Sequence, residues 1–253
     1  MSFTNLDFAV DGEIGVLTLK RPDVLNALDI ATARELRFFS ETMRNTSPVR
    51  ALIVTGAGRA FSAGGDLSSV KLGLDGREAR SLEITSELHA VMLNFARMDA
   101  PVIAAVNGIA AGAGFALACA CDIIIAASSA KFMAAYTLAG LCPDLGLTYT
   151  LPRLVGAGVA KSLILTNRMV LAPEAKIMGL VADVVADDQL LPTAKGIGAE
   201  ILKGSSAAIG VTKQLLETSH SATFEAQLAR ESKSLAALSA TDESFQRCLK
   251  FVK

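Results

Sequence analysis

Two turns built from small residues could together bind an oxygen anion. AFSAGGDL (residues 60–67) and NGIAAGAGF (residues 107–115) each follow an apolar, strand-like segment. Ligands of open α/β sheets bind outside the carboxyl ends of strands, and the first N–H groups of a helix lack intrahelical partners. If the two turns meet, their N–H groups would form an oxyanion hole. Gly64, Gly65, Gly112 and Gly114 would also suit plain tight turns, so both interpretations stay open.

Other catalytic or nucleotide-binding motifs are incomplete. GAGFAL and GAGRAF lack the third glycine of the dinucleotide fingerprint, VGAGVAKS lacks the glycine before the lysine of a P-loop, and no GxSxG is present. His89 and His220 have no convincing Ser or Cys partner, so we interpret both as ordinary surface or helix residues. The four cysteines form no CxxC pair, which predicts reduced thiols and no metal site.

Composition narrows the class of protein. The chain has 253 residues and is 51% hydrophobic, enough for one sizeable α/β domain without a disulfide or metal. Its net charge of -1, with both signs interspersed, argues against nucleic acid or an anionic membrane as partner. The N-terminus lacks a signal-peptide pattern, so we expect a cytoplasmic protein. Residues 101–127 are long enough to span a membrane, but their Ala and Gly content favours buried strands around a turn and helix.

Strand and helix patterns alternate around the two turns. We expect a hairpin at the Asp11-Gly12 dipeptide, a helix capped by Asp29, and a core domain of residues 1–190 followed by a helical region of residues 191–253. The expected strands are 51–56, the start of 101–127, 122–128 and 181–186, and the expected helices are 29–46, 76–99, 173–178 and several after 188.

Four blocks resemble the crotonase, or enoyl-CoA hydratase/isomerase, superfamily. They are RPDVLNALD (residues 21–29), AFSAGGDL, the whole of 101–127, and AGLCPDLGLTYTLPRLVG (residues 139–156). The match is collinear over nearly the whole chain. The resemblance implies an α/β spiral of ββα repeats, a helical C-terminal trimerisation region, and a homotrimer or a dimer of trimers. It also implies a coenzyme A thioester as substrate, with no further cofactor, and it is greatest for the isomerase and epoxyphenylacetyl-CoA isomerase-like branch.

The resemblance also assigns roles to residues. It implies that the N–H groups of Gly65 and Ala113 bind the thioester oxygen, that Ala63 meets the adenine, and that residues 20–27 line the coenzyme A path. Arg21 is either a phosphate ligand or a solvated surface charge, and the carboxylate of Asp66 is expected to cap a turn. The residues expected to contact substrate are Ala63, Asp66, Leu67, Arg21, Leu25, Ala116 and Tyr136.

The sequence departs from the hydratase pattern at both acid/base positions. Hydratases of this superfamily use two glutamates because adding water needs one group to activate the water and one to supply a proton. Ala116 and Tyr136 occupy those positions here, whereas Asp144 falls where isomerases carry their single acid. We therefore expect an acyl-CoA isomerase with Asp144 as acid/base. The alternatives are a hydratase, a non-catalytic acyl-CoA-binding protein, and, for Asp144 itself, a turn or helix cap. Tyr136 would be a pocket wall or a proton donor.

Overall fold

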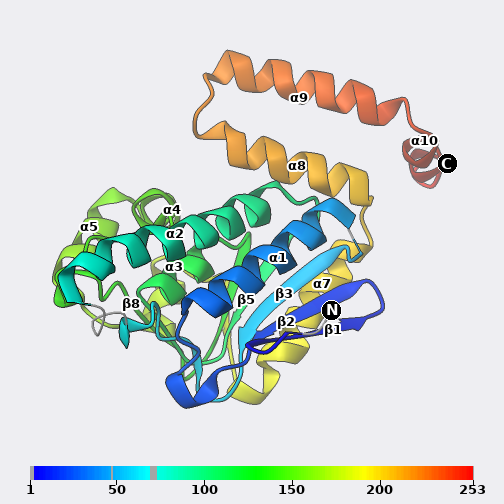
Figure 1. The fold of residues 1–253 in the computed structure, drawn as a ribbon. Helices are drawn as coiled ribbons and strands as arrows, with labels where there is room; N and C mark the ends of the chain where they lie inside the picture. Colours follow the sequence, from blue (N-terminus) through cyan, green and yellow to red (C-terminus); the bar gives the residue numbers. More distant parts are fainter. Residues whose placement is uncertain (1–2, 47, 69–72, 253) are drawn as a thin grey trace.

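Apolar strands build two sheets that run through the body of the protein (Figure 1). The computed structural model describes residues 3–46, 48–68 and 73–252. The larger sheet has the order β1-β2-β3-β5-β7-β10 and is parallel except for the β1–β2 hairpin, which turns at Gly12 as predicted. Its strands are β1 (Leu6–Asp11), β2 (Ile14–Leu19), β3 (Ala51–Gly56), β5 (Val102–Val106), β7 (Ile123–Ala127) and β10 (Asp183–Val185).

The smaller sheet gives the fold its repeat. It contains β4 (Ala60–Ser62), β6 (Ile109–Ala111), β8 (Lys131–Met133) and β9 (Val170–Leu171), in that order. Each of β3, β5 and β7 in the larger sheet is followed by a short strand in the smaller one, and helices then follow. This spiral of ββα turns confirms the predicted fold class. The sequence alone indicated only a turn between the strand of residues 102–106 and a helix, and β6 occupies that interval.

Two long helices cover one face of the larger sheet, and one covers the other. α1 (Ile30–Thr46) packs beside α2 (Gly73–Arg97). Leu36 and Phe39 of α1 and Phe95 of α2 are buried in the core. Asp29 Oδ1 accepts the Thr32 N–H at 2.7 Å, which confirms the predicted cap of α1. α7 (Leu190–Leu202) contacts β3, β5 and β7 from the opposite side. The shorter helices are α3 (Ala113–Cys119), α4 (Leu147–Val155), α5 (Ala157–Thr166) and α6 (Ala172–Ile177).

The last helices extend away from the body (Figure 1). α8 (Ser206–Ser219) is fastened by Lys213, whose buried Nζ lies 2.8 Å from Asp122 Oδ2 and 2.6 Å from the carbonyl oxygen of Phe95. α9 (Phe224–Ser239) and α10 (Asp242–Leu249) contain no buried residue. Because α7 packs on the sheet and α8 is fastened to the body, the described part of the chain that contains no buried residue begins after α8. The domain boundary at residue 190 stays a prediction.

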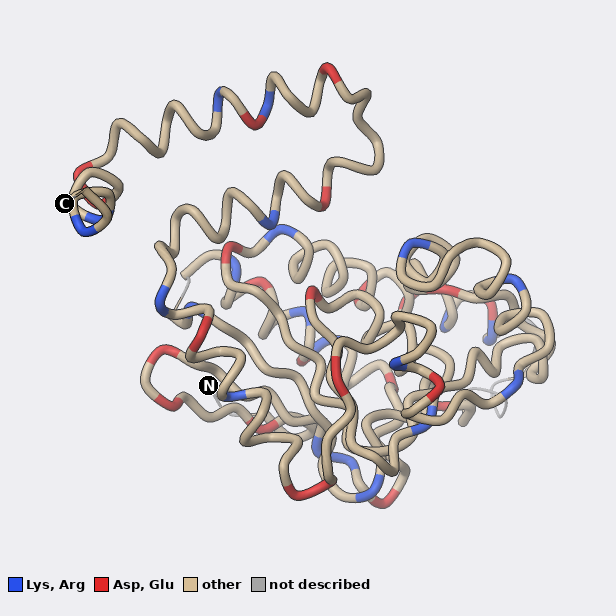
Figure 2. Tube along the Cα trace, turned by 180° about the vertical axis from the view of Figure 1, so that it is seen from behind, with Lys and Arg blue, Asp and Glu red and all other residues tan. Residues whose placement is uncertain are grey.

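The surface carries charges of both signs, and Figure 2 shows Lys and Arg interspersed with Asp and Glu along the chain. Residues 101–127 form β5, β6, α3 and β7. Within the described residues, no helix has the length and apolar character to cross a membrane. The cytoplasmic location stays a prediction.

Candidate active site

The two small-residue turns lie against each other, and glycines make the contact possible. β4 pairs in parallel with β6, which brings the ends of both strands together. Gly64 has a φ of +99°, and a Cβ there would lie 2.7 Å from the carbonyl oxygen of Ala111. A Cβ at Gly114 would lie 2.3 Å from the carbonyl oxygen of Ser62. The turn and anion-site interpretations of these glycines are therefore compatible, because the tight turns are what bring the two backbones into contact.

Two backbone donors flank this contact. Gly65 bridges Leu28 in parallel: the Leu28 N–H donates to Gly64 O at 2.7 Å, and the Asp66 N–H donates to Leu28 O at 3.0 Å. In a parallel bridge the N–H of the central residue, Gly65, points to the other side. Ala113 is the first residue of α3, where an N–H has no intrahelical partner. Among the described residues, no hydrogen bond uses either N–H.

Both donors line one cavity of about 670 Å³. Its walls come from the segments after β4, β6 and β8, from the loop before α4, from the start of α1, and from one side of α2. A cavity of this size, with an apolar lining and few polar groups, is typical of a small-molecule site. The predicted site residues that line it are Ala63, Gly65, Asp66, Leu67, Ala113, Tyr136 and Asp144.

Asp144 presents a carboxylate to the cavity. It lies in the loop before α4, and its Oδ1 is 2.8 Å from Nε2 of His89 on α2. Its side chain is 34% exposed. Among the described residues the carboxylate accepts no backbone N–H, and the residue that precedes α4 is Gly146. The interpretation of Asp144 as a helix cap is therefore wrong. Its backbone does open the turn before α4, since its carbonyl oxygen accepts the Leu147 N–H at 3.1 Å.

The Tyr136 hydroxyl is buried beside Asp144. Within the described part of the chain it has no hydrogen-bond partner. Burial raises the pKa of Tyr136, and the nearby Asp144 charge raises that pKa further, against an opposing effect of the nearby Asp144 backbone N–H. The phenol therefore keeps its proton at neutral pH, which is compatible with a pocket wall and with a proton donor.

Arg21 lies beside the cavity and is held by carboxylates. Its Nη2 is 3.0 Å from Asp29 Oδ2 and 3.4 Å from Asp66 Oδ2, and its side chain is 20% exposed. The interpretation of Arg21 as a solvated charge is therefore wrong. Asp66 Oδ1 also accepts the Ser68 N–H at 2.9 Å, as expected for a turn cap. The Ser68 N–H, with the Arg21 charge, lowers the pKa of Asp66.

Like Arg21, two further predicted substrate contacts, Leu25 and Ala116, are not part of the cavity wall. Ala116 is fully buried one turn into α3, because this helix descends from the cavity into the core. Leu25 is half-buried in a left-handed conformation with a φ of 54°, and its carbonyl oxygen accepts the Ala63 N–H at 2.9 Å. Leu25 therefore supports the cavity through its backbone, because its hydrogen-bond partner Ala63 is part of the wall.

The sequence reasoning missed two residues at this site. Asn26 is buried, and its Nδ2 donates to Ala57 O at 2.9 Å and to Ala60 O at 2.8 Å, which fastens the segment before α1 to the loop before β4. Its position inside the RPDVLNALD block was the one sequence feature that could have indicated a role for Asn26 at this site. His89 was interpreted as an ordinary helix or surface residue. No local pattern could reveal its contact with Asp144, because the two residues lie 55 positions apart.

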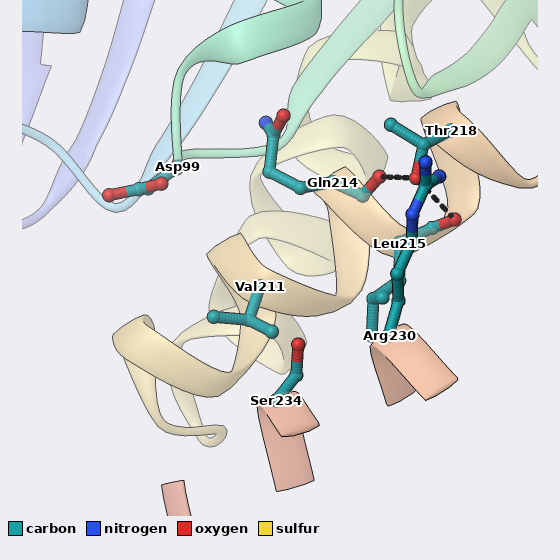
Figure 3. A pocket seen from close by; sticks show the side chains of 7 residues that line it. All are labelled: Asp99, Val211, Gln214, Leu215, Thr218, Arg230 and Ser234. Atoms are coloured by element: carbon teal, nitrogen blue, oxygen red, sulfur yellow. Dashed lines mark hydrogen bonds between the residues drawn. The ribbon is translucent and has the colours of Figure 1, made fainter. Parts of the chain in front are cut away.

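A second cavity, of about 330 Å³, lies between α8, α9 and the segment before β5 (Figure 3). Arg230 and Asp99 lie at its edge, and the Thr218 hydroxyl on α8 already donates to Gln214 O at 2.9 Å. Its described lining does not include the two turns that carry the backbone donors of the larger cavity. We therefore assign the chemistry to the larger cavity.

Known proteins share this fold and sequence. The chain matches the sequence model of the enoyl-CoA hydratase/isomerase family over residues 10–252. The short-chain-enoyl-CoA hydratase of Clostridium acetobutylicum is 35% identical, over 100% of this chain and 96% of its own length. The 1,2-epoxyphenylacetyl-CoA isomerase of Escherichia coli is also 35% identical, over 87% of this chain and 84% of its own. The crystal structure of a putative enoyl-CoA hydratase from Streptomyces coelicolor A3(2) superposes with a TM-score of 0.93 at 31% identity, covering 99% of this chain and 92% of that one.

The chain therefore belongs to the enoyl-CoA hydratase/isomerase family of the crotonase superfamily. It is an enzyme of that family, and most of its named relatives are called hydratases.

The neighbouring glycines of the first turn provide a matched pair of variants. Gly64→Ala should lower the free energy of unfolding by more than about 1 kcal/mol, because the new methyl group meets backbone at a positive φ. Gly65→Ala should cost far less, since nothing lies within 4 Å of a Cβ at that position. Urea unfolding of both variants measures the difference. Equal destabilisation would show that the two turns do not meet at Gly64.

Proposed function

We propose that this enzyme is an acyl-CoA isomerase that moves a proton on a thioester substrate. The observation that carries the proposal is the composition of the cavity wall, where Asp144 stands with the two backbone donors. The other lining carboxylates, Asp29 and Asp66, are both paired with Arg21. Position 116 holds a buried alanine, which can neither give nor take a proton.

In the proposed mechanism, Gly65 and Ala113 polarise the thioester carbonyl. Asp144 takes a proton from the α carbon, the C–H electrons move into an enolate, and the two N–H groups bind the resulting oxygen anion. Asp144 then returns the proton two carbons away, which shifts the double bond. One carboxylate suffices because the same group removes and replaces the proton. The reaction as proposed needs no cofactor beyond its thioester substrate.

A hydratase is the second candidate, and the names of the relatives favour it. Water addition would require a second protic group near Asp144. Tyr136, with its buried and unpartnered hydroxyl, is the residue at the second hydratase position that could supply one. This candidate predicts that crotonyl-CoA is hydrated faster than any 3-enoyl-CoA is isomerised.

Asp144→Asn tests the proposed base. The amide has nearly the same shape but cannot accept the α proton, so 3-enoyl-CoA and ring-epoxide acyl-CoA isomerisation should fall by about 10²- to 10⁴-fold in kcat. Mass spectrometry of an acyl-CoA panel measures the products. Asp11→Asn, on the exposed β1–β2 hairpin, should retain wild-type rates. Retained isomerisation in Asp144→Asn, or wild-type hydration of crotonyl-CoA as the faster reaction, contradicts the proposal.

We also propose that the C-terminal helices dock on further copies of this chain, as a homotrimer or a dimer of trimers. Phe224, Leu228 and Leu235 are 73%, 48% and 70% exposed on α9. Their spacing of four and seven residues places them on one side of the helix. An apolar side of this kind on a helix with no buried residue is typical of an interface.

Light scattering after size-exclusion chromatography tests the assembly. The wild type should have three or six times the chain mass of 26.3 kDa. Leu235→Asp should lower that mass, because it places a charge inside the proposed interface. Lys233→Asp, which lies on the opposite side of α9, should leave it unchanged. A wild type with the mass of one chain would overturn the proposed assembly.

A further inference from the structure

His89 contacts the proposed base from outside the cavity. Its Nε2 lies 2.8 Å from Asp144 Oδ1, and the two side chains are 53% and 34% exposed. Asp144 lines the cavity, whereas His89 does not. α2 contributes Thr85 and Leu88 to the wall, so His89 follows directly on the residues that face the substrate space. The carboxylate therefore stands between the cavity and a half-exposed imidazole.

The two oxygens of this carboxylate have different surroundings. Oδ1 is engaged by His89, and among the described residues no hydrogen bond involves Oδ2. The imidazole ring makes no other hydrogen bond within the described part of the chain. One oxygen is thus available to a substrate, and the ring nitrogen that does not touch Asp144 is available to water.

We propose that His89 is a positioning residue that also connects Asp144 to solvent protons. This inference rests on the proposed function, because it requires Asp144 to take the α proton. After the C–H bond breaks and an O–H bond forms on Asp144, the carboxyl group turns about its Cβ–Cγ bond. The ring first moves its own proton from Nε2 to Nδ1 by exchange with water, which frees the Nε2 lone pair. Asp144 then passes its proton to Nε2, Nδ1 releases a proton to water, and the ring is left with its proton on Nε2, as at the start. The enolate keeps the electron pair of the broken C–H bond throughout.

This relay has a consequence that can be measured. A proton held on Asp144 can return to the substrate or exchange with water, and His89 sets the balance between the two. Because an imidazole can accept a proton on one nitrogen and give one up from the other, it carries protons where an amide cannot. The chain's other histidine, His220, follows α8 and serves as a matched control.

Deuterium exchange measures this balance. Butyryl-CoA, whose α protons can exchange without any isomerisation, is incubated in D₂O with the wild type and with His89→Gln, His89→Ala and His220→Gln. Mass spectrometry follows deuterium at the α carbon, and 3-enoyl-CoA isomerisation is measured in parallel.

Wild type and His220→Gln should exchange deuterium at the same rate. His89→Gln can still donate to Oδ1, so its isomerisation should stay within about threefold of wild type while its exchange falls by about tenfold. His89→Ala should lose both activities.

The outcomes separate the two proposals. Wild-type exchange in His89→Gln would overturn the relay and leave the proposed function intact. Loss of isomerisation in His89→Gln to the level of His89→Ala would overturn the division between positioning and relay. No exchange by the wild type, with no isomerisation either, would overturn the proposed function and this inference together.

Discussion

The close contact between the backbone of Gly64 and the turn of residues 111–113 is the constraint on which the site depends. Any side chain at Gly64 would collide with the carbonyl oxygen of Ala111, and any at Gly114 would collide with that of Ser62. The short parallel pairing of β4 with β6 holds the two turns at this distance. The larger sheet, the long helices and the buried core all serve to keep that pairing in place, because a shift of about 1 Å would separate the donors.

In the proposed mechanism, backbone N–H groups of the two contacting turns bind the substrate oxygen, and the side chains around them determine which protons are transferred. In that mechanism the two N–H groups stabilise the enolate oxygen whatever side chains surround them. The reaction then depends on which proton-transferring groups line the same cavity. Here the buried hydroxyl of Tyr136 lines the cavity with Asp144, His89 contacts Asp144 from outside the cavity, and position 116 on α3 holds a buried alanine.

Several elements of the fold could be predicted from the sequence because they depend on residues close together in the chain. The Asp11-Gly12 hairpin, the Asp29 cap and the strand of residues 51–56 are determined by near neighbours, and the structure confirms them. The short strands β4 and β6 were missed by local patterns, since three residues carry too little periodicity to distinguish a strand from a turn. Contacts across the fold, above all His89 with Asp144 and Arg21 with Asp66, depend on how separate elements pack, and no spacing in the sequence encodes them.

The central claim is that Gly65 and Ala113 together bind the thioester oxygen. Infrared difference spectroscopy of butyryl-CoA labelled with ¹³C at its carbonyl measures that bond directly. We predict that the carbonyl band moves to lower wavenumber on binding to the wild type. The shift should shrink in Gly64→Ala, because a methyl group there meets the carbonyl oxygen of Ala111 and forces the two turns, and with them the two donors, apart. A bound carbonyl band at the same wavenumber as in free butyryl-CoA would contradict the account.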